Sequence, residues 1–244
     1  PWIASACFFV CALVNVAVRL RPDPLEVSGG LNSQQGVGVV TPNLRAALQT
    51  IRGIRNARVA LSAMVISQVT MVAVMTMTPV HLKLHGYENV SPYVISLHIA
   101  GMFAFSPLVG KYADHYGRVN AIFLGAVLLV VATALSAVSG EGNPMLFPSL
   151  WLLGIGWNFG LIGGSSLLVE SIDDSERVRV QGTADLLMSF CGGLAGFSSG
   201  FVRRAIGFHL LSTASLVLAG VLLVYVMAGF AHTRPTVESL LRRR

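Results

Sequence analysis

Long stretches without a charged side chain recur along this sequence, and each is about as long as a helix that crosses a membrane. The hydrocarbon core of a bilayer is about 30 Å thick, and about 20 apolar helical residues span it. Of the 244 residues, 54% are hydrophobic and 11% are charged, whereas an ordinary soluble domain has about 25% charged residues. We therefore predict an all-α integral membrane protein, folded as a multi-pass helical bundle.

Seven stretches are long enough to span a membrane. Membrane helices are predicted over residues 1–18, 59–80, 92–110, 119–138, 146–169, 181–202 and 206–230. A linker over residues 19–58 follows the first span, the other six spans form a bundle over residues 59–230, and residues 231–244 form a basic tail. Because the sequence opens directly in an apolar stretch without a preceding basic region, we expect that an N-terminal part is missing.

The linker changes character midway. Its second part, NLRAALQTIRGIRNAR, places Leu44, Leu48 and Ile51 on one helical face, with arginines largely elsewhere. This pattern fits a helix that rests on the membrane surface, and it fits a solvated linker helix nearly as well.

Lysine and arginine are distributed unevenly between the two sides that these spans define. Fourteen of the 17 lie on one side, and Lys83, Arg203 and Arg204 lie on the other. Because cytoplasmic loops retain an excess of basic residues, the loop over residues 110–119 and the C-terminus are predicted to be cytoplasmic, in a protein of the cell membrane. The net charge of +6 does not indicate nucleic-acid binding, since the basic residues lie between apolar runs rather than on one folded face.

The loop GKYADHYGRV, residues 110–119, gathers charges between two apolar spans. Gly110 and Gly117 lack a Cβ, so they permit a sharp turn or a close helix approach. Asp114 and Arg118 are four residues apart and opposite in charge, so they can pair on one helical face. The general need for basic residues in cytoplasmic loops explains Lys111 and Arg118. It does not explain the two glycines and the aspartate.

The order of these elements resembles that of the major facilitator superfamily. It consists of one span, a long linker and six spans, with Gly-x-x-x-Asp-x-x-Gly-Arg between the second and third of those six. In that family twelve helices form two halves of six. The resemblance implies that this chain is the sixth helix, the central loop and the C-terminal half, completed by the missing N-terminal half or by a partner chain. It also implies that Gly110, Asp114, Gly117 and Arg118 form a cytoplasmic gating motif.

Glu170 ends the span over residues 146–169 on the same side as Arg118. We predict that Arg118 and Glu170 form an ion pair. A solvated loop of acidic and basic residues is the alternative, and the sequence gives it comparable weight.

Glycines and a few polar residues distinguish two of the spans. Glycines repeat every fourth residue at positions 156, 160 and 164, and again at positions 192, 196 and 200, a pattern typical of close helix packing in membranes. Polar groups within a membrane are candidates for function because they are costly to bury. The candidates for proton coupling are His98 and Asp185, and those for a substrate cavity are Gln68, Trp157 and Asn158.

Each of these residues also has a structural interpretation. A histidine can hydrogen-bond between helices, Asp185 can cap the neighbouring loop, which we favour slightly, and the other three can pack between helices. His81 and His85 have a spacing that metals accept, but HLKLH lacks an acidic third ligand, so we predict a solvated loop and no metal site. The sequence has no phosphate-binding glycine loop and offers no catalytic residue or cofactor site, so an enzyme is the least favoured class.

The resemblance and the sparse charge lead to one main hypothesis and two rivals. The main hypothesis is a secondary active transporter that works by alternating access and exports an amphipathic or drug-like small molecule in exchange for protons. A metabolite importer or uniporter of the same family is the first rival. The second is a membrane protein that keeps the fold without transport, as a sensor or assembly partner.

Overall fold

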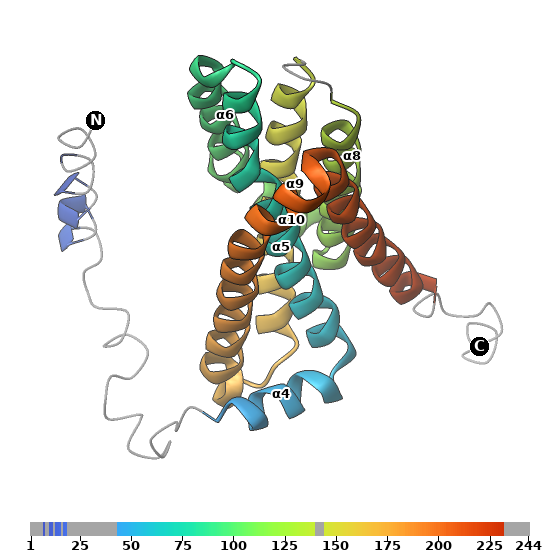
Figure 1. Ribbon diagram of the computed structural model, residues 1–244. Helices are drawn as coiled ribbons and strands as arrows, with labels where there is room; N and C mark the ends of the chain where they lie inside the picture. Colours follow the sequence, from blue (N-terminus) through green and yellow to red (C-terminus); the bar gives the residue numbers. More distant parts are fainter. Residues whose placement is uncertain are drawn as a thin grey trace. The chain divides into compact units, whose positions relative to one another are not determined.

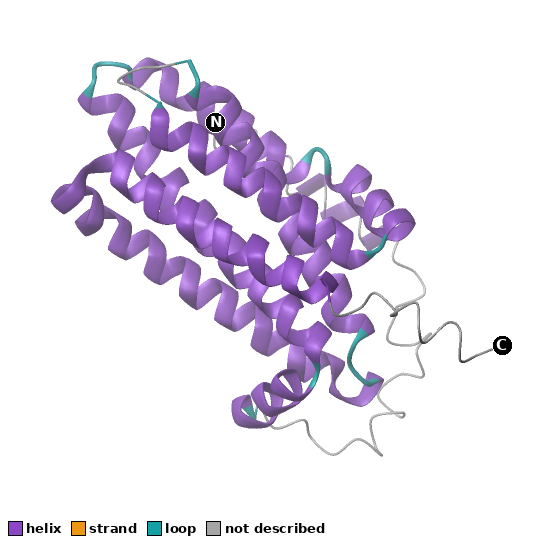
Figure 2. Cartoon of the chain, turned by 90° about the vertical axis from the view of Figure 1, so that its right-hand side faces the viewer, coloured by secondary structure: helices purple, strands orange, loops and turns teal. Residues whose placement is uncertain are grey.

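The computed structural model describes residues 43–139 and 144–231, together with residues 7, 10, 11, 13–15, 17 and 18. It divides the chain into two compact units, Pro1–Asn43 and Leu44–Arg244. Helices joined by short loops make up the described part of the second unit, in which no strand occurs (Figure 2). They are α4 (Leu44–Gly53), α5 (Arg55–Leu84), the short 3₁₀ helix η2 (Glu88–Val90), α6 (Ser91–Phe103), α7 (Ser106–Tyr116), α8 (Arg118–Val138), α9 (Leu146–Glu170) and α10 (Asp174–Ala231).

Five helical segments among the described residues are long and apolar enough to cross a membrane, which confirms the all-α multi-pass fold. The last of them, α10, has 58 residues, about 87 Å at 1.5 Å per residue, nearly three times the hydrocarbon thickness. Gly207 divides it into two limbs, because its φ of 84° and ψ of 172° are not helical. The two limbs correspond to the spans predicted over residues 181–202 and 206–230. Most of the span predicted over residues 1–18 and nearly all of the predicted tail lie outside the described residues.

The span predicted as one helix over residues 92–110 consists of two helices. α6 ends at Phe103 and α7 begins at Ser106. Pro107 explains the break, because it has no N–H and its ring would clash with the carbonyl of Phe103 in a continuous helix. A discontinuous helix therefore lies within a membrane span.

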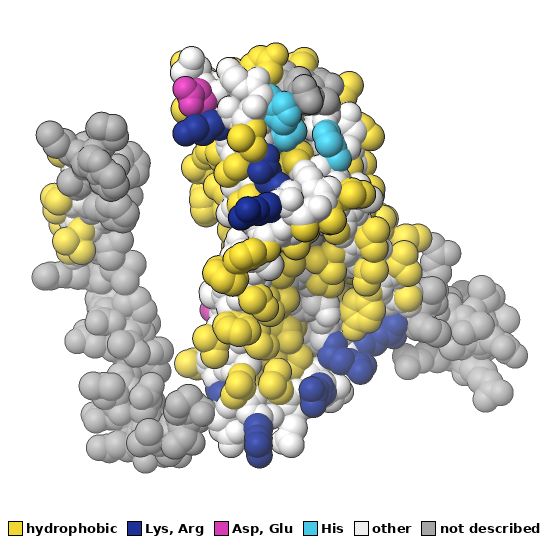
Figure 3. Space-filling view, viewed as in Figure 1, with side chains coloured by type: hydrophobic (Ala, Val, Ile, Leu, Met, Phe, Trp, Pro, Cys, Tyr) yellow, Lys and Arg dark blue, Asp and Glu magenta, His cyan; other side chains and the backbone are white. Residues whose placement is uncertain are grey.

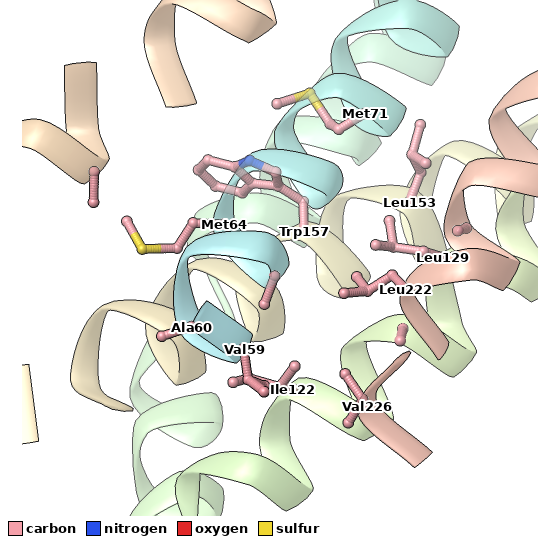
Figure 4. Close-up of a cluster of buried hydrophobic side chains, with 14 of the residues drawn as sticks. Val59, Ala60, Met64, Met71, Ile122, Leu129, Leu153, Trp157, Leu222 and Val226 are labelled. Carbon is pink, nitrogen blue, oxygen red and sulfur yellow. The ribbon is translucent and has the colours of Figure 1, made fainter. Parts of the chain in front are cut away.

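The core is formed mainly by α5, α8, α9 and α10. Figure 4 shows apolar side chains from these helices meeting at one place, among them Ile122, Leu129, Leu153 and Leu222, each fully buried. α9 packs against α5, α6 and α8, whereas α10 packs mainly against α5 and α8. Figure 1 shows α5 between the two limbs of α10, which diverge from the turn at Gly207.

The glycine repeats pack closely, as predicted. A Cβ added to Gly164 would lie 2.7 Å from Met64 Cγ, and one added to Gly156 would lie 3.0 Å from the backbone nitrogen of Leu129. Gly160 and Gly192 are similarly close to α5, but no atom of the described residues lies within 4 Å of a Cβ at Gly200. The helices therefore approach each other through five of the six repeat positions, and Gly196 is the loosest of the five, with its nearest neighbour at 3.2 Å.

α4 lies across one end of this bundle. Its Ala47 and Ile51 are buried, and Thr50 Oγ1 donates a 3.0 Å hydrogen bond to Glu176 Oε2 at the start of α10. The face predicted for membrane contact thus packs partly on protein, and Leu44 is exposed. A membrane-surface position for α4 stays a prediction.

Candidate functional site

The motif residues form the end of α7, a turn at Gly117 and the start of α8. Gly117 has φ 95° and ψ 151°, a conformation that side chains with a Cβ rarely adopt, so the glycine permits this reversal. Gly110 behaves differently. It lies inside α7, and no described atom would come within 4 Å of a Cβ at that position, so no described helix makes the predicted close approach there.

Arg118 joins three helices at this end of the bundle. Its Nε donates a 2.8 Å hydrogen bond to Glu170 Oε1 at the end of α9, and its Nη1 forms an ion pair with Asp114 Oδ1 on α7. Arg118 is 23% exposed, whereas Asp114 and Glu170 are 71% and 52% exposed. Exposed ion pairs contribute about 0.2–1 kcal/mol each, so these contacts can hold the three helix ends and still break without a large cost.

A polar contact joins α5, α9 and α10 in the bundle interior. Trp157 is 7% exposed, and its Nε1–H donates a 2.6 Å hydrogen bond to Gln68 Oε1. A Cβ on Gly192 would lie 2.9 Å from Gln68 Nε2, so the glycine leaves room for the amide. Two of the three residues predicted for a substrate cavity therefore contact each other.

Asn158 lies on another side of α9. It is 1% exposed, and its Oδ1 accepts a 3.3 Å hydrogen bond from Ser106 Oγ, directly after the break between α6 and α7. Its Nδ2 has no hydrogen-bond partner among the described residues. Irregular backbone at membrane depth occurs where it is buried in protein or lines a cavity. Sequence reasoning missed Ser106, although the Ser-Pro pair inside an apolar span was a signal.

His98 is fully buried between α6 and α9. Its Nδ1–H donates a 2.7 Å hydrogen bond to the Leu150 carbonyl, and its Nε2 has no partner in the described part of the chain. A Cβ on Gly154 would lie 2.4 Å from the His98 carbonyl oxygen, so the two helices are in close contact here. This is the geometry of an interhelical hydrogen bond, one of the two interpretations that the sequence left open.

Asp185 lies on the surface of the first limb of α10. Its Oδ1 accepts a 2.9 Å hydrogen bond from Gln181 Nε2, one turn earlier on the same helix, so the capping of the neighbouring loop that the sequence slightly favours does not occur. Leu186 and Phe190 beside it are also exposed. A carboxylate on an apolar membrane helix usually faces a water-filled cavity or a partner.

The histidines of HLKLH are placed differently from the prediction. His81 belongs to the last turn of α5 and is 2% exposed, so the prediction of a solvated loop is wrong for this residue. It stacks on Phe208 beyond the turn of α10. In the described part of the chain, no group of three histidine, cysteine, aspartate or glutamate side chains is arranged to hold a metal ion.

The fold and these polar contacts define a multi-pass helical membrane protein. The family model of the Major Facilitator Superfamily matches residues 1–196 and, separately, residues 89–243. The chain is 36% identical over 94% of its length to the uncharacterized MFS-type transporter YddS of Bacillus subtilis (strain 168), and 34% identical over 93% to YdeG of the same organism. The chain belongs to the major facilitator superfamily, a family of transporters, which confirms the class predicted from the sequence.

Other relatives are more distant. The chain is 30% identical over 67% of its length to the riboflavin transporter RfnT of Brucella anthropi, which it covers to 41%. It spans about half the length of its Bacillus relatives, 53% in each case. No solved structure matches the chain.

Proposed function

We propose that this chain forms the C-terminal half of a secondary active transporter that exports an amphipathic small molecule in exchange for protons. The observation that carries the proposal is a pair of polar contacts on two sides of α9 in a mainly apolar bundle: Trp157 contacts Gln68, and Asn158 contacts Ser106 beside a broken helix. Discontinuous helices near the midplane are typical of substrate sites in transporters. Apolar walls with few polar groups suit an amphipathic ligand.

Relatives named as multidrug resistance proteins or efflux pumps support export. The chain is 27% identical over 40% of its length to the multidrug resistance protein MdtL of Salmonella paratyphi C. The whole transporter would need a second half, supplied by an N-terminal part of the same protein or by a partner chain, in the cell membrane with the C-terminus in the cytoplasm. The end of the bundle that carries Arg118 and Glu170 would then face the cytoplasm and act as the gate, with Asp114 and the open face of Gly110 turned to the second half.

Asp185 is our candidate for the coupling group. Its side chain is exposed on a helix whose other exposed side chains are mostly apolar. Because a carboxylate in such a position usually faces a water-filled cavity, a proton can reach Asp185 through that water. His98 is fully buried, and protonating its Nε2 would place an uncompensated charge between α6 and α9. We therefore assign His98 a packing role.

The test uses inverted membrane vesicles that contain the full-length transporter, with ethidium as the probe. A proton gradient should drive ethidium accumulation, a protonophore should abolish it, and Asp185→Asn should remove the dependence on the gradient. The matched control is Ser189→Ala, one turn along the same exposed face. If Asp185→Asn keeps the dependence of transport on pH, the coupling assignment is wrong.

The similarity to RfnT favours a second candidate, an importer or uniporter of a metabolite. Riboflavin is the probe for this alternative. Riboflavin uptake that persists in the presence of a protonophore, without ethidium transport, would replace export by this function. Absence of both activities in a folded, full-length protein would favour a sensor or assembly partner.

A further inference from the structure

We propose that the turn of α10 and the groove below it bind one anionic phospholipid, with its phosphate at the turn and an acyl chain in the groove. This goes beyond the proposed transport function. The site lies between the limbs of α10 and does not include His98, Trp157, Asn158 or Asp185.

The first observation is a concentration of basic residues where membrane proteins usually have few. Lys83, Arg203 and Arg204 are the three basic residues that the sequence assigns to the side with the fewest positive charges. The end of α5 and the turn of α10 carry all three. Figure 3 shows basic and histidine side chains gathered at the upper end of the face that also carries α10, with an acidic side chain at their edge and apolar side chains below them.

These cations, Lys83, Arg203 and Arg204, form no ion pair with a carboxylate within residues 43–139 and 144–231 of the described chain. Arg203 Nε and His81 Nε2 are buried and have no hydrogen-bond partner in these ranges. Buried polar atoms usually have partners, so an anion at this turn would compensate a local excess of positive charge.

The histidines beside the arginines hold the turn in place. The ring of His81 stacks on Phe208 with centroids 4.4 Å apart, and the rings of His85 and His209 lie 4.4 and 5.8 Å from it. His209 Nδ1–H donates a 3.1 Å hydrogen bond to the Ala137 carbonyl at the end of α8. Three helices thus support a fixed cationic surface.

The second observation is the groove, which begins at this turn. It has a volume of about 420 Å³ and is bounded at its upper end by Val202 and Leu211, which flank the turn. Along the first limb it continues to Cys191, eleven residues away, which corresponds to about 17 Å of helix. One leaflet accounts for about half of the 30 Å hydrocarbon core, so the groove matches the depth of a single acyl chain.

The chemistry of the groove wall favours hydrocarbon over a polar solute. Ser198, Ser199 and Ser215 line it, but their hydroxyls donate to carbonyls of their own helix at 3.2, 2.7 and 3.0 Å. The other lining side chains are Val69, Ala73, Cys191, Leu194, Ala195, Val202, Leu211, Ala214 and Leu218. A groove without free donors, ending at unpaired cations, is complementary to a lipid with one negative headgroup.

The experiment is native mass spectrometry of the full-length protein in detergent, with phosphatidylglycerol, phosphatidylcholine and inorganic phosphate as separate probes. Phosphatidylglycerol should remain bound in preference to phosphatidylcholine. Arg203→Gln and Arg204→Gln should each lower its binding about fivefold, as expected for one cation near a lipid surface, whereas Arg52→Gln at the other end should not. Ala214→Phe should block the groove, and Thr213→Phe, exposed on the same limb but outside the groove, is its control.

Three results would overturn the proposal. Equal retention of phosphatidylcholine would show that the cations do not select the headgroup. Displacement of the lipid by inorganic phosphate, with no effect of Ala214→Phe, would indicate a site for a free anion. Loss of all lipid from the unsubstituted protein would show that no such site exists. Ethidium transport by the same variants reports separately on the proposed function, since none of these residues belongs to the proposed pathway.

Discussion

Replacing Gly154 by alanine should separate α6 from α9. The added Cβ would lie 2.4 Å from the His98 carbonyl oxygen and 3.0 Å from the Met102 nitrogen. Both are backbone atoms, so no side chain can rotate to relieve the clash, and α6 must move away by almost 1 Å. The hydrogen bond from His98 Nδ1 to the Leu150 carbonyl, now 2.7 Å, would lengthen to about 3.5 Å and be lost.

The cost follows from these displacements. Overpacking a close contact costs about 1–3 kcal/mol, and a buried donor left without its acceptor costs about 1–3 kcal/mol. Because both effects come from one movement and overlap, we expect a loss of about 2–4 kcal/mol in the free energy of unfolding.

The control is Gly193→Ala, where no atom in the described part of the chain lies within 4 Å of the added Cβ. Heating followed by size-exclusion chromatography should give an apparent melting temperature about 5–15 °C below that of the control, from the usual scaling for domains of this size. Gly101→Ala, whose Cβ would lie 2.6 Å from the Trp151 carbonyl oxygen, should behave like Gly154→Ala. Melting temperatures of Gly154→Ala and Gly193→Ala that agree within error would refute the reasoning.

Two further predictions concern the polar contacts. Arg118→Glu should impair transport in the vesicle assay. Adding Glu170→Arg should restore transport only in part, because the new glutamate would still lie beside Asp114. Full recovery of transport, or no recovery, would contradict the ion cluster that joins the three helices. A double-mutant cycle with Trp157→Phe and Gln68→Leu, measured by thermal unfolding, should give a coupling energy of about 0.6–1.7 kcal/mol, the range for hydrogen bonds inside membranes. A coupling energy near zero would show that the 2.6 Å hydrogen bond between the two side chains does not contribute to stability.

The fold class could be predicted because membrane crossing depends on length and hydropathy, which are local properties of a sequence. The same reasoning treated residues 92–110 as one helix, because Pro107 does not lower hydropathy although it breaks the backbone. Close packing at Gly156, Gly160 and Gly164 was also predictable, since a four-residue repeat places small residues on one face. Gly200 belongs to such a repeat, but no described residue packs against it. The spacing of residues in a sequence does not show how far along a helix its neighbour extends.

The candidate site was harder to predict because its partners are far apart in the sequence. Arg118 and Glu170 are 52 residues apart, and their pairing was expected from the shared side of two spans. The separation of Asn158 from Trp157 was not expected, although adjacent residues on a helix point about 100° apart. The burial of His81 was missed because its partners, Phe208 and His209, come from the other end of the bundle sequence.

The distribution of close contacts indicates which part of the bundle is rigid. α9 approaches backbone atoms of α5 through Gly164, of α6 through Gly154 and of α8 through Gly156, in each case within about 3 Å of where a Cβ would lie. Such contacts cannot slide without a backbone clash, so these four helices should move as one body, as the proposed transport mechanism would require. α10 makes few contacts with α9, packs against α5 and α8 instead, and diverges into two limbs. The proposed substrate centre at Gln68 lies where this group of helices meets the first limb of α10. The three atoms nearest to a Cβ on Gly192 would all belong to the side chain of Gln68, the closest at 2.8 Å, and a side chain can rotate where a backbone cannot, so this contact can adjust to a ligand.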